Sequence, residues 1–492
     1  MINLKKYISG VSLLSVFFLF AQTTPSTVMY SSMIDGSKSR NLPSNIENST
    51  SEKVVLSPKE MVDVNLNAMA ADPVLKNANW AFVVYDPKTK KIISSYNEDM
   101  PLIPASTTKL LTTETAINML GEKFRWNTQL EYSGKIDENG VLNGNIYIVG
   151  SGDPSLGTSK GGASPYRDIV SNFMNSITDS GIKKVNGDII IQTALFKGNI
   201  AMIPENVVWT EVNNYYLPVG STKDINPANE KLFSNRNKKV DISSIDKKYF
   251  YISPYAKKIV FAEEYQEAPL TTKIPDAPAF LANSLKVTMA KSGVLVSGKV
   301  VTKLADAQPE ARKTLSVYKS PMLSDIMYYI NQRSDNSLSE AFLKTVGFHK
   351  YGDQTSESGR MVVVDHLRNS SFDLEGLSYA DGSGLSRGNK VTAISQVKFL
   401  TSLMNEKYYR TFFDSLPIGG QSGTLKSMFQ GDANGRVFAK TGTLNRVKTL
   451  AGYLKTNSGK TLVFSLLVNN YNGSVGQVKN KMEKIIAPAL EL

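Results

Sequence analysis

The sequence has no cysteine, which excludes disulfide bonds and a thiol nucleophile. It has only two histidines, His349 and His366, which is too few for most zinc hydrolase sites. A Ser-His-Asp triad stays open on this count, although neither histidine lies in a pattern typical of one. Beyond the N-terminal segment there is no long apolar run, so we expect no later transmembrane helix.

The rest of the composition is that of a globular protein. The chain has 492 residues, of which 41% are hydrophobic and 20% charged, enough for two or three domains. Its net charge of +12 suits nucleic acid, an anionic wall polymer or a membrane surface. Because no nucleic-acid motif accompanies the charge, we expect no nucleic-acid partner, and peripheral contact with a membrane or cell wall stays open.

The N-terminus is typical of a secretory signal. Lys5 and Lys6 precede an apolar run from Ile8 to Phe20, which Ala21 and a polar stretch follow. We expect a signal peptide over residues 1–22, cleaved near Ala21, and an exported, periplasmic protein. The alternatives are an uncleaved anchor or a buried helix. With no cysteine after the run, a lipoprotein anchor is excluded.

Residues 23–55 are rich in Ser, Thr, Asn and Pro and predict a flexible leader. Folded structure is expected from Ser57-Pro58-Lys59-Glu60, a capping box with proline at the first helical position. Two β-rich runs, Trp80–Tyr85 and Ile92–Tyr96, predict a hairpin. Ser106 then opens a helical pattern that ends at Gly121.

The texture changes between about residues 127 and 310. Short β-like runs alternate there with Gly, Asn and Asp turns, which predicts one or two inserted β-rich domains. Part of this region is basic because it contains three lysine pairs, Lys238-Lys239, Lys247-Lys248 and Lys257-Lys258. We favour a solvated surface for these pairs over a contact with a polyanion. After residue 310 helical patterns return, followed by three strands and a final helix.

Three short motifs occur in order along the chain: Ser106-Thr107-Thr108-Lys109, Ser334-Asp335-Asn336 and Lys440-Thr441-Gly442. Each is weak alone. Ser-x-x-Lys recurs at four further positions, Ser180, Ser244, Ser316 and Ser395. Only Ser106 follows a predicted hairpin and opens a long apolar helix, where the helix dipole favours developing negative charge. By itself Ser106 is more consistent with a helix N-cap than with a nucleophile.

The order and spacing of the motifs resemble a known family. Ser-x-x-Lys with Ser-x-Asn and Lys-Thr-Gly is shared by penicillin-binding proteins and class A β-lactamases. Here 228 positions separate Ser106 from Ser334 and 106 separate Ser334 from Lys440. The long first gap resembles the class C low-molecular-mass penicillin-binding proteins, the DacB-like D-alanyl-D-alanine carboxypeptidases and endopeptidases of peptidase family S13. Further strings support the resemblance: Gly150–Pro154, Asp381–Arg387, Leu416–Gly420, Gly423–Leu425 and Ala439–Thr443.

The resemblance covers about residues 56–490 and implies an α+β fold. The catalytic penicillin-binding domain, an antiparallel sheet flanked by helices, is expected over 56–126 and 311–492. An inserted domain II is expected over 127–198 and 276–310, and an inserted domain III over 199–275. The implied activity is a serine D,D-peptidase that acts on peptidoglycan stem peptides, is acylated by β-lactam antibiotics and needs neither metal nor organic cofactor.

The resemblance also implies roles for the motif residues. Ser106 is the expected nucleophile and Lys109 the proton acceptor, kept neutral by burial and by the positive charge of Lys440. Ser334 is expected to relay the proton and Asn336 to hold Lys109. Lys440 and Thr441 are expected to bind the terminal carboxylate of the substrate, and Asp335 and Gly442 to line the substrate site. The backbone N–H groups of Ser106 and Thr443 are expected to form an oxyanion hole.

One residue departs from the family. At the end of the strand before the second insert, where an aspartate usually holds the amino end of the diaminopimelate side chain, this chain has Gln192. Glutamine supplies no negative charge, so another acid serves or the preference for that side chain is weaker. Two alternatives to the peptidase stay open. They are a β-lactamase, which would need fast deacylation, and a wall-binding scaffold without catalysis.

Overall fold

The computed structural model describes residues 56–192, 208–212, 215–219, 249–251, 259–261, 277–303, 310–352, 355–370 and 372–492. Leu56–Leu492 form one unit of the chain. The expected signal peptide, the leader, most of domain III and the three lysine pairs lie outside the described residues. Among the helices that are described, none is both long enough and apolar enough to cross a membrane.

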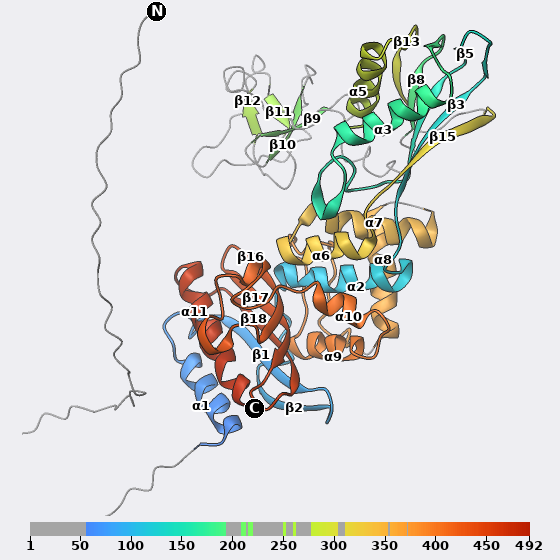
Figure 1. The fold of residues 1–492 in the computed structure, drawn as a ribbon. Coiled ribbons are helices and arrows are strands. Elements are labelled where there is room, and N and C mark those ends of the chain that lie inside the picture. The colour runs from blue at the N-terminus through green and yellow to red at the C-terminus, as the bar shows by residue number, and fades with distance from the viewer. Residues whose placement is uncertain are drawn as a thin grey trace, which may run out of the picture. The chain divides into compact units, whose positions relative to one another are not determined.

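A five-stranded antiparallel sheet forms the centre of the catalytic part (Figure 1). Its strands run in the order β16 (Val437–Leu444), β17 (Val447–Lys455), β18 (Thr461–Asn469), β1 (Asn79–Asp86) and β2 (Lys91–Tyr96). The hairpin predicted around residues 80–96 and the three C-terminal strands are thereby confirmed. The first and last segments of the chain are joined in register, with Trp80 opposite Val468 and Val84 opposite Phe464.

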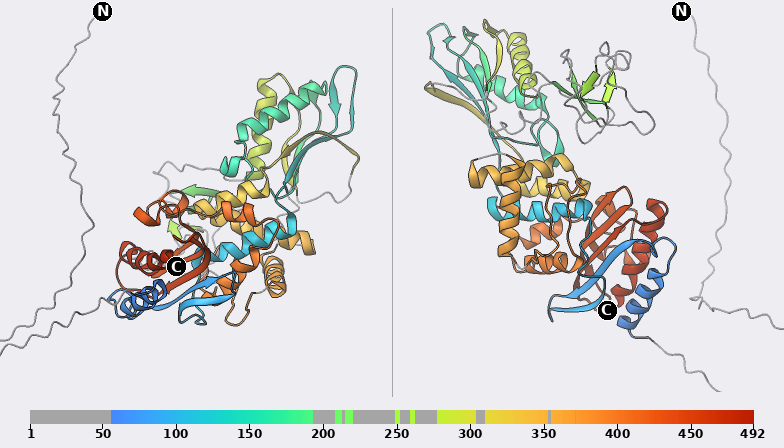
Figure 2. Two further views of the ribbon diagram at one scale, coloured as in Figure 1. Left: turned by 60° about the horizontal axis from the view of Figure 1, so that its bottom comes forward. Right: turned by 180° about the vertical axis from the view of Figure 1, so that it is seen from behind.

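Helices cover both faces of this sheet (Figure 2). On one face lie α1 (Pro58–Ala70) and α11 (Val475–Ile486), which pack on alternate strand residues such as Leu450 and Leu454. The intervening residues, Ala451 and Tyr453 among them, face a second core with α9 (Ala393–Leu403). Successive side chains of a strand therefore point alternately into the two hydrophobic cores on either side of the sheet. α1 begins with the predicted capping box of Ser57 and Glu60.

The second core also contains the helices that position the motifs. They are α2 (Thr108–Leu120), α6 (Leu323–Arg333), α7 (Asn336–Tyr351), α8 (Ser356–Asn369) and α10 (Tyr409–Asp414). α2 is enclosed, since every residue from Thr108 to Ile117 is buried, and it ends at Gly121 as the sequence predicts. A helix buried on all sides holds its N-terminal residues rigidly, which suits a site that begins there.

β16 is an edge strand, and only its first half is covered. Gly419 donates to the carbonyl of Val437 at 2.8 Å, and Ala439 donates to the carbonyl of Pro417 at 3.0 Å. These bonds surround an isolated bridge between Ile418 and Phe438. In the part of the chain that the structure describes, no further backbone bond continues along this edge past Ala439.

The inserted part has a core of its own, built on two sheets. The larger sheet has the order β14 (Val300–Lys303), β8 (Ile189–Gln192), β6 (Ile146–Gly150), β3 (Asn127–Ser133) and β15 (Arg312–Lys319). The smaller has the order β13 (Leu295–Val296), β7 (Lys184–Val185), β5 (Val141–Asn143) and β4 (Lys135–Ile136). Two hairpins, β9 (Val208–Val212) with β10 (Tyr215–Val219) and β11 (Tyr249–Tyr251) with β12 (Ile259–Phe261), lie within the expected domain III.

Two helices complete the inserted core, and the prediction of β-rich texture did not include them. They are α3 (Tyr166–Asp179) and α5 (Ala277–Lys291), which pack on each other and on the sheet. After α5 the chain forms two short strands, β13 and β14, which belong to different sheets. The α+β fold class is confirmed, while the domain boundaries stay a prediction.

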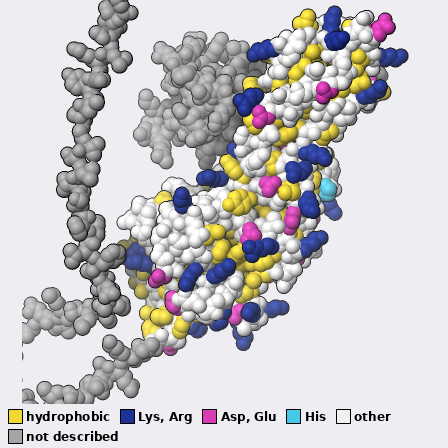
Figure 3. Space-filling model, in the orientation of Figure 1, with side chains coloured by type: hydrophobic (Ala, Val, Ile, Leu, Met, Phe, Trp, Pro, Cys, Tyr) yellow, Lys and Arg dark blue, Asp and Glu magenta, His cyan; other side chains and the backbone are white. Residues whose placement is uncertain are grey.

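The inserted part enters and leaves the catalytic part at one place. Ser320 donates its backbone N–H to the carbonyl of Trp126 at 2.9 Å, and Trp126 N donates to Ser320 Oγ at 3.0 Å. On the face shown in Figure 3, Lys and Arg side chains are scattered among acidic and hydrophobic ones and do not gather into one patch.

Candidate active site

The first motif brings a hydroxyl and an amine together at the start of α2. Ser106 lies in the 3-10 turn Ala105–Thr107, which leads directly into the helix. Lys109, one turn further along, directs its Nζ to Ser106 Oγ at 3.1 Å. Three-residue spacing on a helix places two side chains on one face, so this contact follows from the sequence.

The other two motifs close around this pair. Lys109 Nζ donates to Asn336 Oδ1 at 2.7 Å, and to the backbone carbonyl of Ser383 at 2.5 Å. Lys440 Nζ donates to Ser334 Oγ at 2.9 Å and to the carbonyl of Thr441 at 2.9 Å. Residues from three distant parts of the chain thus form one connected cluster, as their order along the sequence predicts.

Backbone conformation positions Ser334. It has a φ of 57°, in the left-handed region, and ends α6 before Asp335 starts α7. A non-glycine residue in that region is strained, which is more usual at functional sites than elsewhere. The turn between the two helices directs the Ser334 hydroxyl to Lys440 and leaves Asn336, the first residue of α7, facing Lys109.

Both lysines are completely buried, and burial dominates their electrostatics. Burial lowers the pKa of Lys109 to about 8, although the carboxylates of Glu340, Asp381 and Asp335 act to raise it. Burial also lowers the pKa of Lys440 well below its ordinary value, and the charges of Lys109 and Lys448 lower it further. The predicted lowering of the Lys109 pKa by Lys440 is not found; burial lowers it, and the repulsion between the two lysines lowers the pKa of Lys440 instead.

β16 lies directly against the turn that contains Ser106. A Cβ added to Gly442 would come within 2.7 Å of the Pro104 carbonyl oxygen and 2.9 Å of Ser106 N, so only glycine fits there. Thr441 Oγ1 donates to Thr424 Oγ1 at 2.7 Å. Thr443 is exposed one position beyond the glycine. Its role in an oxyanion hole stays a prediction.

Asp335 is already engaged inside the protein. Its Oδ1 caps α7 by accepting from Leu338 N at 2.9 Å. Its Oδ2 pairs with Lys160 of the inserted part at 2.7 Å. These contacts make Asp335 a link between the Ser-x-Asn turn and the insert, while its expected contact with substrate stays a prediction.

Gln192 lies in the larger sheet of the insert, at the end of β8. Its Oε1 accepts a hydrogen bond from Arg312 at 2.9 Å. Arg312 also pairs with Glu131 at 3.4 Å, and its guanidinium lies 3.7 Å above the Tyr147 ring. The structure therefore places Gln192 in a polar cluster of its own, separate from the Ser106 cluster, and its substrate role stays a prediction.

The motifs alone did not identify the support on the far side of Lys109. Glu340 of α7 accepts the backbone N–H groups of Ser383 at 2.8 Å and Gly382 at 3.2 Å, which holds the carbonyl that faces Lys109. Burial raises the pKa of Glu340. The Asp381–Arg387 string contains the sequence signal for this support, because Gly382 and Ser383 belong to it.

Neither histidine reaches the nucleophile. His366 Nε2 contacts the buried Glu114 at 2.7 Å, and Tyr408 donates to the same carboxylate at 2.6 Å. This network ties α2 to α8 and to the start of α10. Ser106 is therefore paired with a lysine amine, and no Ser-His-Asp triad forms in the described residues.

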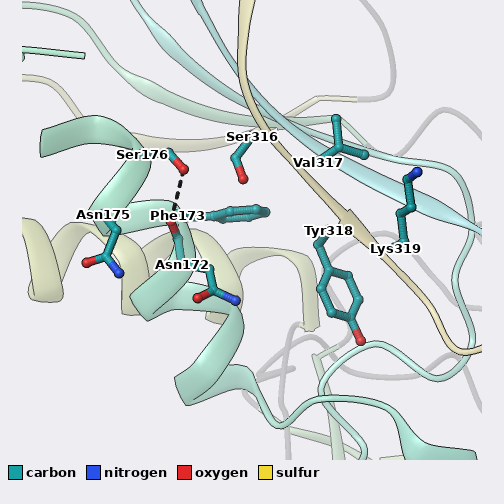
Figure 4. A pocket seen from close by; sticks show the side chains of 8 residues that line it. All are labelled: Asn172, Phe173, Asn175, Ser176, Ser316, Val317, Tyr318 and Lys319. Carbon is teal, nitrogen blue, oxygen red and sulfur yellow. Dashed lines mark hydrogen bonds between the residues drawn. The ribbon is translucent and has the colours of Figure 1, made fainter. Parts of the chain in front are cut away.

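A surface cavity of about 340 Å³ lies in the inserted part, between α3 and β15 (Figure 4). Phe173 points from α3 toward the strand, and Ser176 donates its hydroxyl to the Asn172 carbonyl within the helix. The lining residues are Asn172, Phe173, Asn175, Ser176, Ser316, Val317, Tyr318 and Lys319. Ser316 and Lys319 form one of the recurring Ser-x-x-Lys strings, which here lies on a strand without the other two motifs.

Comparison with known proteins finds similar chains. The D-alanyl-D-alanine carboxypeptidase DacB of Haemophilus influenzae is 24% identical over 441 residues, covering 83% of this chain and 88% of that protein. The D-alanyl-D-alanine carboxypeptidase of Actinomadura sp. strain R39 is 27% identical over 456 residues, covering 83% of this chain and 81% of that protein.

The fold is likewise similar to a solved structure. The crystal structure of penicillin binding protein 4 (dacB) from Haemophilus influenzae superposes with a TM-score of 0.63 at 21% identity, over 87% of this chain and 99% of that one. Residues 62–237 and 201–489 match the family of D-Ala-D-Ala carboxypeptidase 3 (S13). The resemblance inferred from the motifs is thus confirmed, and the chain belongs to the D-Ala-D-Ala carboxypeptidase 3 (S13) family.

Proposed function

We propose that this protein is a serine D,D-peptidase that cleaves peptidoglycan stem peptides through an acyl-enzyme on Ser106. The observation that carries the proposal is the set of contacts around Lys109 Nζ. A neutral amine has two N–H donors and one lone pair. Asn336 and the Ser383 carbonyl accept from two directions, which leaves the lone pair directed at Ser106 Oγ.

Acylation joins Ser106 to the substrate and releases the terminal D-alanine. Ser106 Oγ forms a bond to the carbonyl carbon of the penultimate D-alanine, and Lys109 takes the hydroxyl proton. When the C–N bond breaks, the proton held by Lys109 passes to the leaving amine through the hydroxyl of Ser334, which Lys440 orients, so Lys109 becomes neutral again and Ser334 stays protonated. Water then adds to the ester carbonyl, which releases the shortened peptide and regenerates the Ser106 hydroxyl.

The substrate itself helps to set the charges. Burial lowers the pKa of Lys440, so a terminal carboxylate bound beside it would restore its positive charge. A charged Lys440 then disfavours a second charge on Lys109, which becomes the neutral base. We expect the backbone N–H of Ser106, which lies close to Gly442, to stabilise the oxyanion together with that of Thr443.

The direct test is labelling with a fluorescent penicillin followed by mapping of the adduct. We expect one adduct, on Ser106, and none in Ser106→Ala. A label on any other residue, or no label at all, would reject the proposal. The Haemophilus influenzae relative has been solved in complex with a β-lactam, which supports the choice of probe.

Two further measurements separate the remaining alternatives. A β-lactamase would turn nitrocefin over rapidly, whereas a peptidase is expected to hold its penicilloyl adduct. A scaffold would bind wall sacculi and release no product. Mass analysis of digested muropeptides then distinguishes loss of a terminal alanine, a carboxypeptidase product, from conversion of cross-linked dimers to monomers, an endopeptidase product.

We also propose that the protein is exported to the periplasm. The support is the basic start, the apolar run Ile8–Phe20 and the substrate class, which lies outside the cytoplasm. N-terminal sequencing of the mature protein tests this proposal. A mature chain that begins near Ala21 agrees with it, and one that retains Met1 contradicts cleavage.

A further inference from the structure

Lys448 is a buried lysine next to the active-site strand that the mechanism above leaves unused. It lies on β17 directly opposite Thr443 of β16, and only 4% of its surface is exposed. Its Nζ donates a hydrogen bond to Thr443 Oγ1 at 2.6 Å. Thr443 is itself exposed, so the pair connects the interior with the surface immediately beyond Gly442.

The charge of Lys448 is not balanced inside the protein. Within the described residues it has no carboxylate partner, and Lys479 and Lys440, the charged groups that interact with it, are both cations. Burial lowers the pKa of Lys448 to about 8, and the charge of Lys479 adds to the effect. A buried cation without a counter-ion destabilises a fold. An anion that arrives from solution would supply the missing charge.

The hydrogen bond also determines what Thr443 can offer to a ligand. An ammonium group only donates, so Thr443 Oγ1 must accept from Lys448, and its own proton stays free to donate outward. Thr441 differs, because its hydroxyl donates to Thr424. Thr443 is therefore the hydroxyl on this strand whose proton is available to an external acceptor, and the ammonium behind it strengthens that donor.

We propose that Lys448 is a positioning residue that acts through the Thr443 hydroxyl to hold the terminal carboxylate of the substrate. It thereby selects peptides that end in a free carboxylate over those that end in an ester or amide. The inference rests on the proposed function, and it gives the anionic group that Lys440 is expected to hold a second contact, through the Thr443 hydroxyl.

The test compares two probes that differ only at the anionic group, benzylpenicillin and its methyl ester. The measured quantity is the acid-to-ester ratio of the second-order rate constants for acylation of Ser106. We expect Lys448→Met to lower this ratio by about 10- to 100-fold, the usual effect of a hydrogen bond to a charged group. Thr443→Val, at an exposed position, should lower it by a similar factor.

Two controls separate positioning from structure. Because Lys448 acts through Thr443, the double variant should lose little more of the ratio than Thr443→Val alone. Lys455→Met removes a lysine from the far end of β17 and should leave the ratio unchanged. Lys448→Met should also keep or raise the melting temperature, since it removes an uncompensated buried charge.

An unchanged acid-to-ester ratio in Lys448→Met, whether both rate constants fall equally or neither falls, would overturn the inference at any melting temperature. Additive effects of the two substitutions would also overturn it, because Lys448 would then act independently of Thr443. Failure of the proposed function has a different signature, since in that case neither probe would acylate the wild-type protein.

Discussion

At the scale of single residues, the site is defined by three buried lysines in different surroundings. Lys109 has a carbonyl, an amide oxygen and a hydroxyl around its amine. Lys440 contacts a hydroxyl and a carbonyl, and Lys448 a single hydroxyl. In the proposed mechanism the same type of side chain serves as a base, a bound cation and a positioning group, and the different acceptors around each lysine are the basis of that assignment.

The pKa of Lys109, about 8, predicts how acylation depends on pH. A lysine acts as a base only when neutral, and its neutral fraction rises about tenfold per pH unit below the pKa. The rate constant for acylation by benzylpenicillin should therefore rise steeply from pH 6 and begin to level off near pH 8. Stopped-flow measurement over that range checks this.

Lys109→Met removes the proposed base. Lys123→Met changes an exposed lysine in the same way and is the matched control. The first variant should lose about 100- to 10,000-fold in rate, the usual contribution of a general base, and the second should behave as wild type. A flat profile between pH 6 and pH 8 would show that another group accepts the proton.

At the scale of elements, the close approach of β16 to the Ser106 turn decides the shape of the site. Gly442→Ala would place a methyl group against the Pro104 carbonyl and the Thr449 hydroxyl, which are themselves joined by a hydrogen bond of 2.7 Å. The strand would have to move away from Ser106. We expect penicillin labelling of Gly442→Ala to fall by at least about tenfold, by comparison with other overpacked positions.

Gly476→Ala is the control for this substitution. Gly476 lies exposed in α11, where an added Cβ has only a contact of 3.8 Å to Ser474 Oγ. Alanine should be neutral or slightly stabilising there, since it favours the helix. Full labelling of Gly442→Ala would mean that the strand does not need its close contact with Ser106.

The cap of α7 gives a second prediction at this scale. Asparagine at position 335 can still accept from Leu338 N, whereas alanine cannot. Asp335→Ala should therefore lower the free energy of unfolding by about 1 kcal/mol more than Asp335→Asn. Urea denaturation of both variants measures the difference. Equal losses would assign the stability to the pair with Lys160 instead.

The elements that the sequence predicted well are those defined by local patterns. The capping box at Ser57, the C-cap at Gly121 and the three motifs all depend on residues a few positions apart, so they could be read directly. Lys448 could not, because its importance arises from a strand pairing with Thr443. The α3 helix is not predicted from the sequence, although Ile169, Phe173 and Ile177 repeat at helical spacing and are buried. The glycine and asparagine turns on either side of it favour a β-rich interpretation of the whole region.

At the scale of the whole molecule, the chain enters and leaves the insert through one pair of adjacent strands. β3 and β15 pair from Asn127 opposite Lys319, next to the Trp126 and Ser320 bonds. A two-residue Asn-Gly turn could therefore join Thr128 to Tyr318 and close a hairpin in place of the insert. The remaining residues retain the sheet and both helical layers.

We expect the shortened protein to unfold cooperatively in urea and to be labelled by penicillin at Ser106. Labelling should be slower than in the full chain, because Asp335 loses its partner Lys160. Lys160→Met in the full chain is the control that reproduces only that loss. An unlabelled or insoluble product would show that the catalytic part depends on the insert for folding.

The half-covered edge of β16 has a consequence for solubility. The bridge at Phe438 protects the first half of the strand, while the second half, from Lys440 onward, presents backbone donors and acceptors beside the nucleophile. An open strand edge can pair with any extended chain, including a second copy of the protein. This open row of backbone groups next to Ser106 is thus a place where aggregation can start. A buried lysine, two threonines and a glycine limit that pairing, because they offer little apolar surface to a neighbouring strand.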